Sequence, residues 1–277
     1  GALWLVASIA AAAAWLRRLA RRTASAPRSL LDLGVRNLTR RRGRSLATLG
    51  LLACGSFLIG SIGVFRLDAV RHATQRSSGT GGFALIGQSA LPVLHDLNSE
   101  SGRDALALRA ADLVDVDVVP LRVRDGDDAS CLNLNRAQQP RLLGVRPELL
   151  AERHAFSFAR VARGLPREDP WRLLAPASSG TTPSDAEAVP AIGDLSSILW
   201  AMGKRVGDTL TYTDERGQPF RVRIVAAVAN SILQGSLVID EAAFVRRFPS
   251  ESGHRMFLVD ALPERSPEVA AVLTRAL

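Results

Sequence analysis

The sequence is poor in the residues that build disulfide frameworks, metal centres and covalent catalytic sites. Its 277 residues include two cysteines, Cys54 and Cys131, and four scattered histidines. Neither a cysteine framework nor a metal-ligand pair can be assembled from such spacing. The sequence also contains no H-E-x-x-H, no G-x-S-x-G and no P-loop, which are motifs of zinc proteases, serine hydrolases and nucleotide hydrolases. We therefore expect no catalytic residues, no metal site and no cofactor site, and a chain that is not an enzyme.

Two short patterns come close to binding motifs but lack their geometry. Gly79, Gly81 and Ala84 fit G-x-G-x-x-A, yet they precede an expected strand, whereas the phosphate-binding motif leads from a strand into a helix. Farther along the sequence, residues 125 to 135 contain several side chains with oxygen atoms that could bind calcium. Their spacing lacks the glycine and the terminal glutamate of a calcium-binding loop. They are Asp125, Asp127, Asp128, Asn133 and Asn135. We interpret the first pattern as a flexible lead into the strand and the second as a polar turn.

Acidic residues are nearly absent between Arg17 and Arg44. This stretch has ten arginines and a single acid, Asp32. The arginines are Arg17, Arg18, Arg21, Arg22, Arg28, Arg36, Arg40, Arg41, Arg42 and Arg44. Setting them and Asp32 aside from the 35 basic and 27 acidic residues leaves 25 against 26, so the rest of the chain is nearly neutral. Because the net charge of +8 comes from one short stretch, we expect no nucleic-acid partner.

Charge is missing from the segments on both sides of this stretch. Residues 2 to 16 and 46 to 65 contain no charged side chain, and the second has about the 20 residues that a helix needs to cross a bilayer. The positive-inside rule places the arginines in the cytoplasm and everything after Arg66 outside the membrane. We therefore expect a multi-pass protein of the inner (plasma) membrane. Its parts are a truncated transmembrane helix at 1–16, a cytoplasmic basic loop at 17–45, a transmembrane helix at 46–66 and an extracytoplasmic domain at 67–277.

The N-terminal segment allows an alternative. Gly1 is not a start methionine and the apolar segment begins abruptly, so we expect an internal piece of a longer protein. Residues 24 to 26 (ASA) resemble a signal-peptide cleavage site, but the charges of a signal peptide precede its apolar region, and here they follow it.

Two local patterns indicate contacts at the membrane. Residues 28 to 39 place Leu31 and Val35 on one face and charged residues elsewhere, which predicts a helix in the cytoplasmic headgroup layer or an amphipathic connector without a partner. Small residues recur on one face of the second apolar segment, which favours packing against other membrane helices. They are Ala53, Ser56, Gly60 and Gly63.

The region after residue 67 predicts a mixture of strands and helices. Residues 67 to 78 extend the membrane helix, and residues 163 to 187 form a surface excursion rich in Pro, Ser, Thr and Gly. Expected strands are 83–89, 131–135, 142–145, 209–213, 220–228, 236–239 and 256–261. Expected helices are 147–153, 194–202, 240–247 and 267–277. The hairpin at 209 to 228 is the strongest of these patterns, and the fold class is α+β.

Several segments, taken in order, resemble FtsX-like, MacB-type ABC transporter permeases. Residues 33 to 50 (LGVRNLTRRRGRSLATLG) are similar to the arginine-rich start of a membrane helix in that family. Residues 204 to 210 (KRVGDTL), the strand through Phe220 and residues 235 to 240 (GSLVID) resemble the strands of the family's extracytoplasmic domain. The matches span most of residues 28 to 260 and are weakest over 90 to 190. They imply two transmembrane helices joined by a cytoplasmic amphipathic helix, followed by a mixed α+β extracytoplasmic domain of the MacB-like periplasmic type.

The resemblance implies a permease subunit that works with a cytoplasmic ABC ATPase subunit, on which the ATP is bound. ATP hydrolysis there would be coupled to conformational change of the outer domain, for export or release of a lipid, lipoprotein, peptide or drug-like substrate. Further implied partners are the lipid bilayer and other transmembrane helices of the same permease or of a second copy. A periplasmic partner protein is left open. The apolar segment before residue 28 fits the second half of a two-repeat permease. The alternative is a membrane-anchored sensor or binding domain without transport activity.

Overall fold

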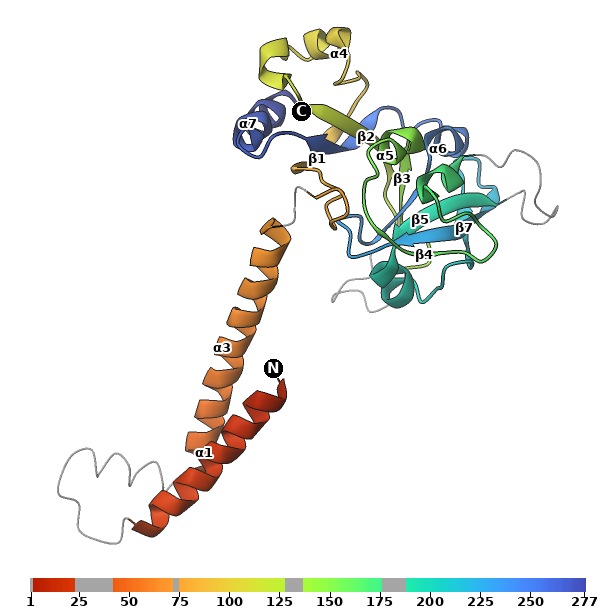
Figure 1. The fold of residues 1–277 in the computed structure, drawn as a ribbon. Helices are drawn as coiled ribbons and strands as arrows, with labels where there is room; N and C mark the ends of the chain where they lie inside the picture. The colour runs from red at the N-terminus through yellow and green to blue at the C-terminus, as the bar shows by residue number, and fades with distance from the viewer. Residues whose placement is uncertain (1, 23–41, 72–74, 128–136, 176–187) are drawn as a thin grey trace. The chain divides into compact units, whose positions relative to one another are not determined.

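The chain divides into two units that are described separately. A computed structural model describes residues 2–22, 42–71, 75–127, 137–175 and 188–277 (Figure 1). The first unit covers Gly1–Val70 and the second covers Arg71–Leu277. The expected amphipathic helix at 28–39 and the expected strand at 131–135 lie outside the described residues.

The first unit consists of two helices, α1 (Ala2–Arg22) and α3 (Arg42–Arg71). Helix α1 continues beyond residue 16, so the first four arginines lie on the helix, and the bounds expected for the basic loop stay a prediction. Helix α3 has 30 residues, about 45 Å at the usual rise per residue. Its expected polar extension to residue 78 is wrong, because the helix ends at Arg71 and residues 75 to 82 form turns.

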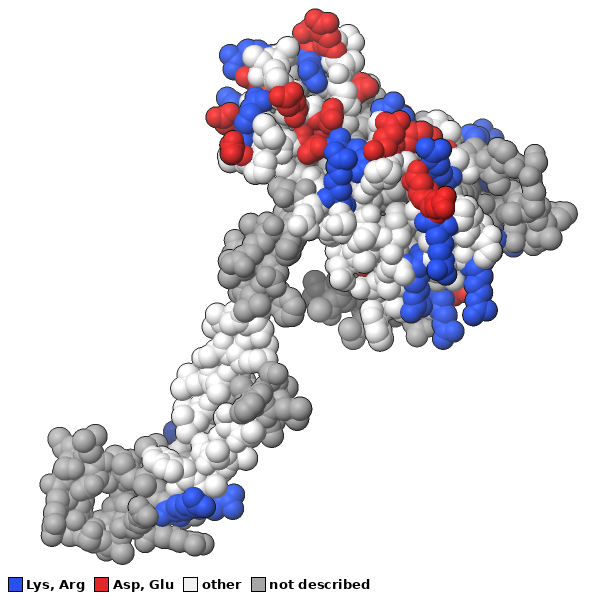
Figure 2. Space-filling view, viewed as in Figure 1, with Lys and Arg blue, Asp and Glu red and all other residues white. Residues whose placement is uncertain are grey.

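Among the described residues, one helical segment is long and apolar enough to cross a membrane. It is Gly43–Ser61, with a mean hydropathy of 1.3 and no part buried within the structure. Figure 2 shows the described surface of α3 as almost free of charge. This segment agrees with the transmembrane helix expected at 46–66, and the one expected at 1–16 stays a prediction.

The second unit is an α+β domain built on a nine-stranded sheet. The strand order is β1-β9-β2-β3-β8-β5-β7-β4, and β6 pairs with β7. The strands are β1 (Leu85–Val93), β2 (Asp117–Arg124), β3 (Arg141–Val145), β4 (Phe158–Val161), β5 (Val189–Asp194), β6 (Thr209–Thr213), β7 (Pro219–Val228), β8 (Ser236–Asp240) and β9 (His254–Asp260).

Strand β2 joins two parts of this sheet. Its first half pairs with β9 up to the register Leu121↔Met256, and its second half pairs with β3 from Arg122↔Gly144 onward. Antiparallel strands β1, β9 and the start of β2 therefore form a small subsheet, while the end of β2 belongs to the larger remainder. A change in the direction of β2 would reorient one part against the other.

Helices and short turns cover the sheet and close three hydrophobic cores (Figure 1). They are α4 (Glu100–Ala105), η1 (Ala110–Leu113), α5 (Pro147–Ala151), η2 (Pro170–Leu174), the π-helical turn η3 (Ser197–Ala201), α6 (Glu241–Arg247) and α7 (Ser266–Ala276). Adjacent residues of β2 point into different cores. Val118 packs with Val269 of α7, whereas Val119 packs in the core that contains Phe156 and Trp171, which we call the central core. Both faces of β2 are thus buried, whereas β1 at the edge keeps Ile86 51% exposed.

Most expected elements are present with shifted ends, including the hairpin β6–β7 and the four expected helical regions. Strands β2, β4 and β5, helix α4 and the turns η1 and η2 were not expected. The prediction that residues 163 to 187 form a surface segment is wrong for η2, because Trp171 in this turn is 1% exposed and packs in the central core. Residues 176 to 187 lie outside the described part of the chain.

Candidate functional site

The polar residues singled out in the sequence have separate structural roles. Asp125 accepts a hydrogen bond from Arg255 at 2.9 Å, and Asp127 accepts from the backbone amides of residues 138 and 139. Among the described residues, no group of three or more His, Cys, Asp or Glu side chains is placed to hold a metal ion. The remaining members of the pattern, Asp128, Asn133 and Asn135, lie outside those residues.

The glycines of the G-x-G-x-x-A pattern allow close packing of the connecting segment, residues 75 to 82. A Cβ on Gly79 would lie 2.0 Å from the backbone oxygen of Asn230. Gly81 has a φ of +67° and faces the ring of Phe156 at 2.7 Å from its Cβ position. The pattern therefore serves the packing of the chain at the start of the α+β domain.

Three hydrogen bonds fix this connecting segment to the domain. The amide of Phe156 donates to Arg76 O at 2.7 Å, and the amide of Ile232 donates to Gly79 O at 2.8 Å. The hydroxyl of Ser157 donates to Ser77 O at 2.7 Å. The expected flexible lead into the first strand is therefore wrong, because tertiary hydrogen bonds hold backbone that has no regular secondary structure of its own.

The residues that receive the connecting segment are themselves strained. Phe156 and Asn230 have φ values of +68° and +46°, a region that costs a non-glycine residue about 1–3 kcal/mol. The ring of Phe156 packs 6.3 Å from Phe83 and 6.0 Å from Trp171, measured between centroids. This aromatic packing holds Phe156 in its unusual conformation, in which its amide donates to Arg76 O.

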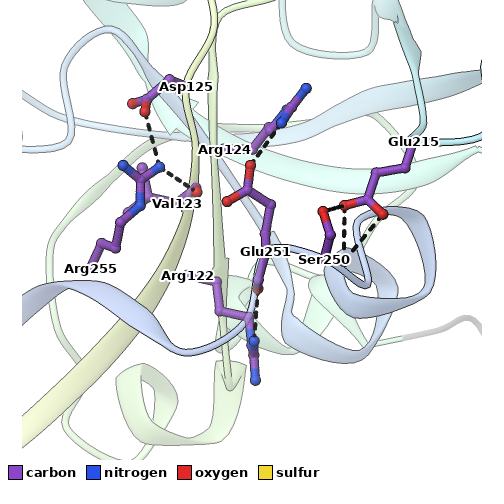
Figure 3. A network of polar contacts seen from close by, with 8 residues as sticks. All are labelled: Arg122, Val123, Arg124, Asp125, Glu215, Ser250, Glu251 and Arg255. Carbon is purple, nitrogen blue, oxygen red and sulfur yellow. Dashed lines mark hydrogen bonds and ion pairs between the residues drawn. The ribbon is translucent and has the colours of Figure 1, made fainter. Parts of the chain in front are cut away.

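Arginines of β2 hold the point where the sheet changes partners (Figure 3). Arg122 donates to the backbone oxygen of Glu251 at 3.0 Å and Arg124 donates to its carboxylate at 2.7 Å. From β9, Arg255 donates to Val123 O and to Asp125, each at 2.9 Å. We call these three arginines and their acceptors the arginine clamp, since they tie the end of β2 to β9 and to the loop before it.

Glu241 at the start of α6 is a further acceptor of Arg122 in the clamp. Its Oε1 lies 3.0 Å from Nε2 of His254 and accepts from Nε of Arg122 at 2.7 Å. The hydrogen bond with His254, followed by that with Arg122, lowers the pKa of Glu241 to about 2. Such partners favour the ionised form, so Glu241 supports the clamp as a carboxylate over the physiological pH range.

A second set of ion pairs holds the other end of β2. Asp117 and Asp260 lie directly opposite each other on β2 and β9, where like charges repel. Arg153 bonds to both, at 3.2 Å to Asp117, and its guanidinium lies 5.2 Å from the ring centroid of Phe83. Because Arg153 follows α5, it links the small subsheet to the rest of the domain.

The hydroxyl and imidazole near the clamp are engaged with different carboxylates. The hydroxyl of Ser250 and its amide both donate to Glu215, while His254 bonds to Glu241. A serine hydrolase needs its imidazole placed to take the proton of the serine hydroxyl. The geometry instead fits positioning: Glu215 anchors the loop after α6 to the hairpin turn.

The fully buried Asp194 organises the end of the domain that receives the connecting segment. Its carboxylate accepts from the amides of Ser196 and Ser197 at 2.9 and 3.2 Å, and from the amide of Ser231 at 2.7 Å. These donors satisfy a buried charge that would otherwise be costly. Asp194 thereby joins β5, η3 and the loop after β7 in one hydrogen-bonded unit.

These contacts join segments of the domain that are distant in the sequence. The connecting segment is fixed to the domain, and both ends of β2 are fixed by arginines. The sequence did not single out Arg122, Glu241 or Asp194, because each has at least one partner that lies 37 to 129 positions away along the chain. A signal that could have drawn attention to β2 is the alternation of arginines with Val123 in residues 122 to 124.

Comparison with known proteins gives structural similarity at low sequence identity. No family model matches the chain, and no curated protein matches it. Among solved structures, the chain is similar to the periplasmic region of MacB from Actinobacillus actinomycetemcomitans, with 12% identity and a TM-score of 0.31. The similarity covers 69% of this chain and 81% of that one. At such values the function of this chain has to be argued from its own residues.

Proposed function

We propose that this chain belongs to an FtsX-like, MacB-type ABC transporter permease. In this proposal a cytoplasmic ATPase subunit hydrolyses ATP, α3 crosses the membrane, and the outer α+β domain changes position to export or release a lipid, lipoprotein, peptide or drug-like molecule. The observation that carries the proposal is α3: residues 45 to 65 of one helix bear no charge, and they follow an arginine-rich segment that resembles the start of a membrane helix in this family.

The connection between α3 and the outer domain supports a mechanical role. Helix α3 is continuous to Arg71, and the chain is fixed to the domain from Arg76 onward. A displacement of a membrane helix would therefore reach the domain through few residues. The arginine clamp and Arg153 support the same role, because they restrain the angle between the two parts of the sheet.

Membrane topology is the first test of this proposal. Arg216 lies exposed at the turn between β6 and β7, so Arg216→Cys, made with Cys54→Ala and Cys131→Ser, should react with an impermeant thiol reagent in intact cells. The positive-inside rule predicts this outward orientation. A cysteine at Arg28, in the arginine stretch, is the matched control and should react only after lysis. The opposite labelling of the two sites would contradict the permease.

Coupling to an ATPase distinguishes transport from sensing. Leu31→Asp or Val35→Asp would place a charge on the apolar face of the helix expected at 28–39. Each should reduce the ATP hydrolysis that co-purifies with the full chain by about tenfold, equivalent to about 1.4 kcal/mol of coupling. Asn37→Asp puts the same charge on the polar face and should leave hydrolysis unchanged. A full chain that purifies without ATPase activity would favour the membrane-anchored sensor.

A further inference from the structure

Trp200 is the most exposed large hydrophobic residue among those described. It is 83% exposed on η3, although its neighbours Ile198 and Met202 are buried at 0% and 3% exposure. The turn is therefore packed into the domain on one side and presents the indole on the other. We propose that Trp200, together with Lys204 and Arg205, contacts the outer surface of the lipid bilayer.

Trp200 lies at the end of the domain that receives the connecting segment. Ile232 bonds to Gly79 O, and the preceding Ser231 bonds to Asp194. Asp194 in turn accepts from the amide of Ser197 in the first turn of η3. This series of contacts runs from the connecting segment to η3 without leaving the domain, and a further bond from Gly235 N to Ser197 Oγ at 2.9 Å supports it.

The length of chain between α3 and this end of the domain keeps it close to the membrane. Residues 45 to 65 span about 31 Å as a helix, which matches a hydrocarbon core of about 30 Å. Residues 66 to 71 add about 9 Å, within or just beyond the headgroups. From Arg71 to Gln75 the chain can extend by no more than about 14 Å. With α3 inserted as proposed, this chain length would hold the face next to the connecting segment near the bilayer surface.

The chemistry of this face fits a lipid surface better than water. Tryptophan concentrates at membrane interfaces, because the indole has an apolar body and a polar N–H. Arg205 is exposed and Lys204 half-buried, directly after the turn, where they can meet lipid phosphates. The nearby carboxylate of Asp208 accepts from the backbone amide of Arg205 at 2.9 Å. The inference rests on the proposed membrane insertion of α3, and it does not depend on transport.

Fluorescence of the full chain in vesicles tests the contact directly. Trp4 and Trp15 are replaced by Phe, which leaves Trp171 and Trp200. The emission of the same chain with Trp200→Phe is then subtracted, which leaves the emission of Trp200. Brominated phosphatidylcholine should reduce the emission of Trp200 by about twofold or more, as for an interfacial indole. Trp171, 1% exposed in the core, should keep its emission and reports that the domain is folded. Adding phosphatidylglycerol should increase the quenching, and Arg205→Gln should remove that increase.

A tryptophan placed in the membrane helix separates the possible failures. Leu51→Trp, in a chain without the other exposed tryptophans, should be quenched by brominated lipid if α3 is inserted. If brominated lipid quenches the tryptophan at position 51 while aqueous acrylamide quenches Trp200, the lipid contact of Trp200 is overturned and the insertion of α3 is not. Protection of Trp200 from both quenchers would also overturn it, in favour of a protein partner. Absence of quenching at both positions would overturn the membrane insertion on which the proposed function depends.

Discussion

Val222 lies in the middle of β7 with its side chain completely buried. It belongs to the core that also contains Phe220 and Ile224, on the face of the strand opposite to Arg221. Val222→Asp would bury a charge without a cation to pair with it, and this class of change costs more than about 3 kcal/mol. Thermal unfolding of the detergent-solubilised full chain, followed by the emission of Trp171, should show a large loss of stability.

Thr211 provides the matched control for Val222. It lies on β6, opposite Arg221 in the ladder, with its side chain exposed. Thr211→Asp adds the same charge on the outer face and should change the free energy of unfolding by less than about 0.5 kcal/mol. Equal losses from the two substitutions would show that the assignment of the two faces is wrong.

The residues that could be predicted from sequence are those governed by local periodicity. Phe220, Val222 and Ile224 alternate with arginines, and a strand that buries one face requires this alternation. The conformation of Phe156, with its φ of +68°, has no local signal, because aromatic neighbours far along the chain stabilise it. The hydrogen bond from Ser231 to Asp194 was likewise unpredictable, since the loop after β7 has to be placed against β5 first.

At the scale of elements, the arginine clamp predicts a dependence of stability on pH. The pKa of Glu241 is lowered from 4.5 to about 2, so its ionised form is favoured in the folded state. Its contribution is therefore complete above pH 4.5 and is lost as the pH falls from 4.5 towards 2. Because the side chain keeps some access to water, we expect about 1–2 kcal/mol.

Glu241→Gln should remove this contribution at pH 7 and flatten the pH dependence of unfolding between pH 4.5 and 2. The wild-type and variant stabilities should converge near pH 2. Glu268, exposed on α7, is the control, and Glu268→Gln should leave the profile unchanged. Denaturant unfolding at a series of pH values measures both. A variant that stays parallel to wild type down to pH 2 would contradict the ion pairs assigned to Glu241.

Elements with strong local patterns were predicted, and those whose pattern conflicts with their place in the sheet were missed. The hairpin β6–β7 combines alternation with a glycine turn, so both strands were found. Strand β2 contains Pro120 although it lies between β9 and β3, and a proline argues against an interior strand. The turn η2 lies in a stretch rich in turn-forming residues, yet it buries Trp171, which composition alone does not reveal.

The whole molecule combines an apolar helix, α3, with an α+β domain that holds the chain by hydrogen bonds from Arg76 onward. If movement of α3 is to reach the domain, the connecting segment has to stay docked. Its docking depends on Gly79, because a Cβ there would lie 2.0 Å from Asn230 O. Backbone cannot yield as a flexible side chain does, so the clash forces the segment away from its hydrogen bonds at a cost of about 1–3 kcal/mol.

Gly79→Ala should therefore release the connecting segment while the rest of the domain stays folded. Trypsin cleavage after Arg76 requires this segment to open, and its rate follows the open population when opening is fast. The variant should be cut roughly 5- to 150-fold faster than wild type in membranes, the ratio that corresponds to about 1–3 kcal/mol. Gly87→Ala is the matched control, because nothing lies within 4 Å of a Cβ at Gly87, and its cleavage should be unchanged.

In the proposed permease, the same Gly79→Ala variant should keep normal outward labelling of Arg216→Cys but lose ATP-dependent movement of the domain. Unchanged cleavage after Arg76 would mean that docking of the connecting segment does not depend on Gly79.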